Sequence, residues 1–384
     1  MHRQLARVSI VLLAVIAAAW SALTFPHAAT SNSVLFDREI VRILNTHCVM
    51  CHMTGGPAED IVTWQQTWLM RDAIHDKVLA RHMPPWAAVA GYGSFKNANQ
   101  LTLREKRFIV SWVEGLGPRN NGEVFFNVPG AGGTQDEPVT ASFEPTVWRL
   151  GEPNQIVEVA PDDFGFGSVE GAELLQANVT IDPLIQEETF LTGLEFLPED
   201  RRNLHSVVFR LADTDQWLAT WTPWYGFREL PRDSGVRMVP GQKIKAEYLL
   251  SEDNSGGAVE GSLGLHFAST PPARLVQETS FENRGRGNKS LRAENTFNSD
   301  TTILALWPEY PAGTRSLEVT AHHPDGRVEI LLLALDIKEQ WPTSYILESP
   351  TTLPAGSRLT VTANAGNAQT AALSGILRLT LSTE

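Results

Sequence analysis

The chain contains only two cysteines, and they lie close together with a histidine directly after the second. The run is Cys48-Val49-Met50-Cys51-His52. Two cysteines in an oxidising compartment would ordinarily predict a disulfide, but Cys-x-x-Cys-His is the pattern at which haem is attached covalently. Two sulfurs on one short turn can bind both vinyl groups of a porphyrin, and the next imidazole can then bind the iron. We therefore expect one covalent haem c and no disulfide in the rest of the chain.

The sequence around this motif argues against two other uses of a cysteine pair. A redox-active dithiol needs a βαβ setting, and a zinc site needs further cysteines. The flanks instead predict helices: Asp37 can cap one that leads into the motif, Thr63 can cap a second that Pro84 ends, and Thr102 begins a third with a capping box. We expect a small all-α, cytochrome c-like domain over residues 33–119.

A haem iron held by His52 also needs a ligand on its other face. Met83 is the favoured residue, because it follows a helix end in a Met-Pro-Pro-Trp segment where proline rigidity can hold the thioether over the iron. His82 is one alternative, and an open coordination position is the other. Met83 could also simply fill the core, as methionines often do.

The first 29 residues contain, in the right order, the three regions of a secretory signal. Basic Arg3 and Arg7 precede an apolar run, and small residues follow up to Ala29. An uncleaved membrane anchor through residues 8–25 is the alternative, because a spanning helix needs about 20 apolar residues. Either version predicts a periplasmic or otherwise extracytoplasmic protein. The formal net charge of −13 argues against nucleic acid as a partner.

The second part of the chain has the pattern of an all-β protein. Short β-branched or alternating runs, such as Ser206–Phe209, are separated by turn clusters, and a faint repeat relates residues 239–267 to 353–381. Many short strands with an internal repeat predict two β-sandwiches in tandem. The expected multidomain α plus β organisation is a signal peptide or anchor at 1–29, the haem domain at 33–119, a linker at 120–144, a first sandwich at 145–271 and a second at 272–384.

Several segments resemble one known type of protein. Those of the helical part are Ile43-Leu44, the Cys48–His52 motif, Arg81–Trp86, Gly91-Tyr92-Gly93 and Ser111-Trp112-Val113. They resemble the cytochrome domain fused to bacterial relatives of the copper type II, ascorbate-dependent monooxygenases. Residues 145–375 resemble the two jelly-roll domains of peptidylglycine and dopamine monooxygenases in Leu194–Phe209, Lys245–Tyr248 and Trp307–Pro311. The resemblance implies two all-β, jelly-roll-type sandwiches behind the haem domain.

Most copper ligands of that family are missing here. At the positions of the family's first histidine pair, only His205 remains. Glu247 stands at the position of the third histidine ligand, and Glu309 and Pro311 stand at the positions of the second histidine pair. The β region contains too few histidines for both copper centres, so copper is not expected. A carboxylate-rich site of His205, Glu247 and Glu309 for a harder ion is the remaining alternative.

The other histidines and the aromatic residues of the β region have structural explanations. His205 and His266 lie inside strand patterns and are expected to be hydrogen-bonded residues of a sandwich. His322 and His323 are adjacent in a strand, so they face opposite sides and do not chelate one ion together. Trp217, Trp221, Trp224 and Tyr225 are expected in a core or an interface.

These features predict a monohaem c-type cytochrome that transfers electrons and has no activity alone. The expected partner is a periplasmic oxidase or copper monooxygenase, for example a paralogue that retains the histidines. A copper-dependent monooxygenase with an unfamiliar ligand set is one alternative function. A non-catalytic assembly module in which haem has a structural or sensing role is the other.

Overall fold

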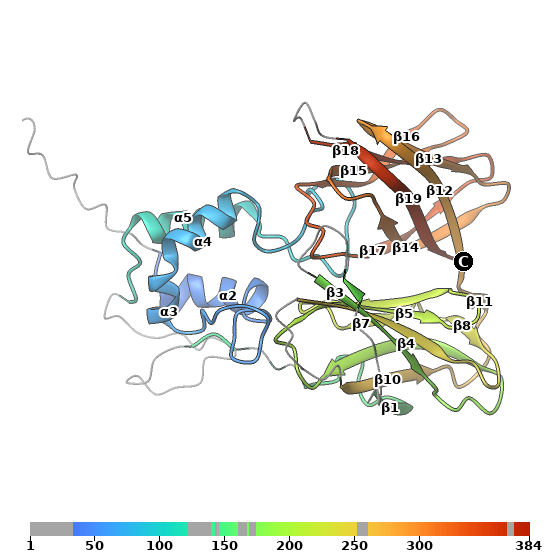
Figure 1. Cartoon of the computed structure of the whole chain (residues 1–384), viewed down its shortest axis with the longest axis horizontal. Helices are drawn as coiled ribbons and strands as arrows, with labels where there is room; N and C mark the ends of the chain where they lie inside the picture. Colours follow the sequence, from blue (N-terminus) through green and yellow to red (C-terminus); the bar gives the residue numbers. More distant parts are fainter. Residues whose placement is uncertain are drawn as a thin grey trace, which may run out of the picture.

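A computed structural model describes residues 34–120, 140–142, 144, 146–159, 167–168, 174–251, 260–366 and 372–384. The expected signal or anchor at 1–29 and most of the expected linker lie outside the described residues. The protein is mostly β, and Figure 1 shows its helices at one end, beside two stacked β bodies. Within the described ranges, no helix is long and apolar enough to cross a bilayer.

The helical region packs five short segments around one core. They are η1 Phe36–Ile40, α2 Val41–His47, α3 Trp64–Leu69, α4 Arg71–Leu79 and α5 Leu103–Glu114. Buried Phe36, Ile40, Val41, Leu44 and Trp112 form the centre of this core. Part of the expected linker also belongs here, because Ala141 is buried in the same core and its N–H donates to the carbonyl of Val62 at 2.8 Å.

Helix caps explain where these helices begin. Thr63 and Thr102 each cap a helix, as expected, and the structure shows a complete capping box at both. The expected cap at Asp37 is wrong: Leu35 is the N-cap, and Asp37 lies inside the first turn. Asp37 instead faces Arg119 at 3.5 Å, so its carboxylate binds the end of the helical region rather than a helix start.

The first β body consists of two antiparallel sheets with a shared core. One sheet has the order β1-β10-β4-β8-β11, with β7 on β4, and the other has β2-β3-β9-β5-β6; the contact of β11 with β8 is parallel. The inward-facing residues of both sheets include Phe196, Phe209, Tyr248 and Leu263. The strands are β1 Gln155–Val159, β2 Gly167–Ser168, β3 Leu174–Ile181, β4 Thr189–Pro198, β5 Leu204–Leu211, β6 Trp217–Trp221, β7 Phe227–Glu229, β8 Ser234–Met238, β9 Ile244–Ser251, β10 Gly261–Phe267 and β11 Arg274–Leu275.

The second β body repeats this arrangement with two four-stranded antiparallel sheets, β12-β19-β14-β17 and β13-β18-β15-β16. Its strands are β12 Gln277–Asn288, β13 Ser290–Thr296, β14 Thr301–Glu309, β15 Thr314–His322, β16 Val328–Leu335, β17 Tyr345–Leu353, β18 Arg358–Ala365 and β19 Leu373–Thr383. Both bodies therefore have the character of jelly-roll-like β-sandwiches. The chain passes between them at Val276, since β11 still pairs with β8. This lies a few residues after the division expected at 271–272.

Residues 86–97, here called the strap, connect the helical region to the second β body. Val89 donates to the carbonyl of Leu333 at 2.8 Å, and Trp86 packs against Tyr345 with ring centroids 5.3 Å apart. Asn97 is buried and donates to the carbonyl of Ser344 at 2.6 Å. The strap lies within the expected haem domain, yet its side chains complete the core of the second β body.

The two β bodies meet through a closed, largely aromatic interface. Trp217 of β6 and Trp307 of β14 are buried with ring centroids 5.4 Å apart. Arg228, also buried, stacks on Trp217 and donates to Ser382 Oγ of the second body at 2.5 Å. The expectation that Trp217 and its neighbours lie in a core or an interface is therefore confirmed.

Candidate functional site

An apolar cavity of about 530 Å³ lies where the helices meet the β bodies. Cys48, Cys51, His52 and Met83, the four residues expected to hold haem, all line it. The helical core supplies most of the remaining wall through side chains such as Ile40, Leu44, Ile61, Val78, Ile109 and Trp112. The structure thus brings these four residues, which are up to 35 positions apart in the sequence, to the wall of one cavity.

The cysteine loop follows directly from the end of α2. Cys48 caps this helix, and the N–H groups of Cys51 and His52 both donate to its carbonyl at 3.0 Å, which forms one tight turn. Burial raises the pKa of each thiol to about 12. A redox-active dithiol instead needs a lowered thiol pKa, so this environment disfavours thioredoxin-like chemistry.

The imidazole of His52 is held in one orientation by a backbone carbonyl. Its Nδ1 lies 2.8 Å from the oxygen of Glu59. Because a carbonyl only accepts, Nδ1 carries the proton and Nε2 keeps its lone pair. Metal-binding histidines are oriented in this way, by donating from the other ring nitrogen to a carbonyl. His52 therefore presents the tautomer that an iron ligand requires.

Met83 and His82 both lie at the cavity, directly after α4. Their N–H groups donate to the carbonyl of Lys77 at 3.2 and 2.8 Å, which turns the chain back at the helix end. His47 also lines the cavity, but its two ring nitrogens face Asn99 and Glu105 at 3.0 and 3.3 Å. The geometry keeps both Met83 and His82 as candidates for the second axial ligand and disfavours His47.

The β bodies contribute one wall of the same cavity through His205, Lys338, Gln340 and Trp341. His205 is the second residue of β5, and its Nδ1 donates to the carbonyl of Gln340 at 3.0 Å. Its ring stacks on Trp341 with centroids 4.5 Å apart. Burial lowers the pKa of His205, so the imidazole is neutral at neutral pH.

A buried arginine fixes the cysteine loop to the first β body. The side chain of Arg201 donates from Nη2 to the carbonyls of Met50 and Pro223, both at 2.8 Å. Met50 lies between the two cysteines, so Arg201 holds the backbone of the motif itself. Sequence reasoning missed Arg201 and Trp341, because no local pattern marks a contact between residues this far apart in the chain.

The alternative metal site of His205, Glu247 and Glu309 is not assembled. Glu247 pairs with Lys245 at 2.6 Å and with Arg210 at 3.5 Å, and Glu309 pairs with Arg378 at 3.4 Å. No group of three or more His, Cys, Asp and Glu able to hold a metal ion occurs among the described residues.

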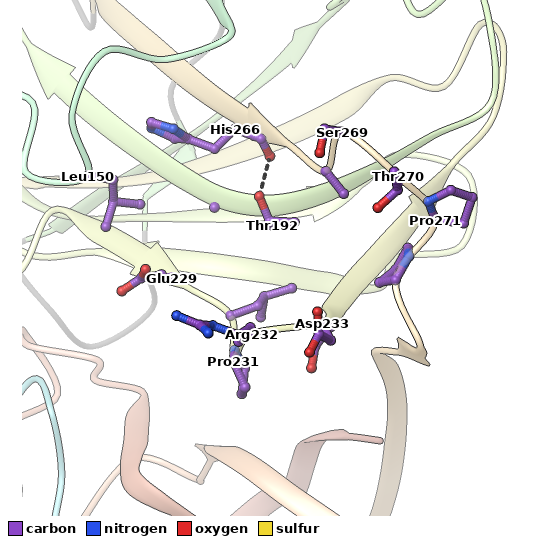
Figure 2. A pocket seen from close by; sticks show the side chains of 15 residues that line it. Leu150, Thr192, Glu229, Pro231, Arg232, Asp233, His266, Ser269, Thr270 and Pro271 are labelled. Atoms are coloured by element: carbon purple, nitrogen blue, oxygen red, sulfur yellow. Dashed lines mark hydrogen bonds between the residues drawn. The ribbon is translucent and has the colours of Figure 1, made fainter.

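Two further histidines of the β bodies are held by carboxylates. His266 Nε2 lies 3.2 Å from Glu195, and the buried His323 lies 3.3 Å from Glu329. His266 also borders a hollow of about 420 Å³ in the first β body, where Thr192 donates to its carbonyl (Figure 2). The hollow contains none of the residues expected to bind haem or metal.

Comparisons with known proteins assign no family. No family model and no curated protein matches the chain. Among solved structures, the major capsid protein P2 of bacteriophage PM2 is 10% identical with a TM-score of 0.28, and 60% of this chain covers 96% of that chain. PNGF-II is also 10% identical with a TM-score of 0.28, at 59% and 65% coverage. The tandem CBM22 domains of Paenibacillus barcinonensis Xyn10C are 10% identical with a TM-score of 0.17, at 59% and 92% coverage.

Proposed function

We propose that this protein is an extracytoplasmic monohaem c-type cytochrome that transfers electrons to or from a redox partner. The observation that carries the proposal is the meeting of Cys48, Cys51, His52 and Met83 around one apolar cavity. His52 in the correct tautomer supports the same interpretation. When bound, haem supplies an iron centre that gains and loses one electron.

The residues present fit such a group. Cys48 and Cys51 lie on one turn and would form the two thioether bonds. His52 would bind the iron from one side, with its ring held by the carbonyl of Glu59. Met83 would bind from the other side, or His82 in its place. The apolar helical wall would exclude water from the ring, and burial of this kind is one of the ways in which a protein sets a haem potential.

The β bodies would act as a scaffold and docking surface in this proposal. A partner oxidase or copper monooxygenase, such as a paralogue with complete histidines, would exchange the electron. Copper-dependent hydroxylation by this chain is disfavoured, because Glu247 and Glu309 are bound to basic side chains. A structural or sensing haem would instead require an iron with an open position.

Expression in a host that matures c-type cytochromes tests the proposal. The purified protein should be coloured, contain one iron, and keep its haem after denaturation, and Cys48→Ser with Cys51→Ser should abolish attachment. A colourless protein without porphyrin mass on the cysteine peptide would refute the assignment.

The same preparation identifies the second axial ligand. Met83→Ala should remove the methionine–iron absorption band of the ferric protein and open the iron to carbon monoxide. Met70→Leu is the matched control, because Met70 also lines the cavity but lies on the helical wall between α3 and α4. An unchanged band in Met83→Ala, or the absence of this band from the native protein, would exclude Met83 as the ligand.

A further inference from the structure

We propose that Trp341 and Trp224 form an electron route from the haem cavity through the junction of the β bodies to the protein surface. The inference rests on the proposed function, because the electron comes from the haem iron. It goes further by assigning the side of the molecule on which the electron leaves.

The route begins at the cavity wall. Trp341 and His205 both line the cavity and stack on each other with centroids 4.5 Å apart. The cavity wall consists mostly of helical residues, and this aromatic pair lies on the side of the β bodies, where it would face a porphyrin bound in the cavity. The pair is rigid, because the Nδ1 of His205 donates to the carbonyl of Gln340, the residue next to Trp341.

The route continues into Trp224, which belongs to the first β body. Its ring centroid lies 5.9 Å from that of Trp341, inside the range in which aromatic rings are in contact. The Nε1 atom of Trp224 is buried and has no hydrogen-bond partner among the described residues. Its indole is thus held by packing against Trp341 and the second β body.

The route ends at a second hollow, of about 280 Å³. Trp224 lines it together with Trp221, Val147 and Arg149. Val147 is 48% exposed, so solvent and a partner reach this rim. Trp341 borders the cavity and Trp224 borders the hollow, so two neighbouring rings connect the two spaces. Electron tunnelling weakens steeply with distance, which favours a path through rings in contact.

The step transfers one electron and makes or breaks no bond. The ferrous iron becomes ferric, and a one-electron oxidant at the hollow is reduced. In the cell the oxidant would be a redox protein. In the test it is a ruthenium(III) polypyridyl complex attached to the surface and formed by a light flash.

The experiment compares two labelling positions on the full haem-containing chain. Val147→Cys places the ruthenium complex at the hollow, and Leu103→Cys, 65% exposed on α5, places it on the helical face. Haem attachment consumes both native thiols, so only the introduced cysteine reacts. Trp341→Leu and Trp224→Leu should each slow electron transfer to the Val147 label several-fold. Transfer to the Leu103 label should stay unchanged.

Two further variants separate conduction from packing. Trp341→Phe keeps an aromatic ring in the route and should keep most of the electron-transfer rate to the Val147 label. Trp68→Leu removes a tryptophan outside the route and should leave the rates to both labels unchanged. Trp224→Leu covers the case in which Trp341→Leu loses haem, because Trp224 does not line the cavity. The reduction potential of each variant is measured to confirm equal driving force.

Equal slowing at both labels, or no slowing at the Val147 label, would refute the route while leaving the haem assignment intact. A chain without covalent haem would refute the proposed function itself. The two failures are thus distinguished by the colour of the protein before any rate is measured.

Discussion

Arg201 connects the Cys48–His52 motif to the first β body, and its replacement in the proposed haem protein should change both stability and reduction potential. Its side chain is only 6% exposed and donates two hydrogen bonds, to the carbonyls of Met50 and Pro223. Its positive charge is also close enough to Cys51 to act on that thiol. We therefore expect Arg201→Met to loosen the cysteine loop and to remove a cation from beside the proposed haem.

The magnitude follows from the two hydrogen bonds. Hydrogen bonds to charged groups contribute about 1.5–3 kcal/mol each, net of the water contacts that they replace, so this pair contributes about 3–6 kcal/mol. Burial lowers the pKa of Arg201 from 12.5 to about 10, which shows that the charge is partly desolvated and places the expected value at the low end of this range. We therefore expect Arg201→Met to lower the free energy of unfolding by about 3 kcal/mol.

Guanidinium unfolding followed by haem absorbance measures the stability, and redox titration measures the potential. Ferric iron carries one more positive charge than ferrous iron, so a nearby cation disfavours the ferric form. Removing that cation in Arg201→Met stabilises the ferric form, and the reduction potential should therefore fall. Arg201→Lys keeps the charge and should keep the potential while losing part of the stability. The matched control is Arg202→Gln, since Arg202 is a surface residue paired with Asp200 and such pairs contribute about 0–1 kcal/mol. Equal effects of Arg201→Met and Arg202→Gln would refute the reasoning.

Two further predictions concern other contacts between the helical region and the β bodies. Burial holds the pKa of His205 below its ordinary 6.5, so the unfolded chain binds this proton more readily and stability should fall as pH drops below about 6.5. His205→Gln should flatten this dependence in unfolding curves, and an unchanged slope would contradict the argument. In the strap, Asn97→Ala should cost about 2–4 kcal/mol, because the carbonyl of Ser344 and the N–H of Ile346 lose their partner. An unfolding midpoint equal to that of the native protein would show that the strap does not hold the second β body.

Local features of the helical region followed from the sequence. The two capping boxes, at Thr63 and Thr102, involve residues three positions apart, so a short window contains all the information. The cap expected at Asp37 failed for a tertiary reason, because Arg119 and Asn120 draw that carboxylate away from the helix start. A side chain with two possible partners cannot be assigned from its neighbours in sequence.

The β wall of the cavity could not be predicted in this way. Arg201 and Met50 are 151 positions apart, and His205 and Gln340 are 135 positions apart. Neither pair carries a motif, and both contacts exist only because two β bodies fold against the helices. The strap shows the same limit, since residues 86–97 have no strand pattern of their own and gain their structure from β16 and β17.

Glu247 takes part in the junction between the β bodies, and we expect the purified protein to hold no stoichiometric copper. Glu247 pairs with Arg210, whose guanidinium lies over the ring of Trp307 in the other body at 5.6 Å. Glu309 pairs with Arg378. A copper ion would have to displace these cations and open a packed interface. It would also have to compete with the hydrogen bond from His205 to the carbonyl of Gln340. One tightly bound copper per chain, lost on Glu247→Gln, would show that the junction opens and that this argument is wrong.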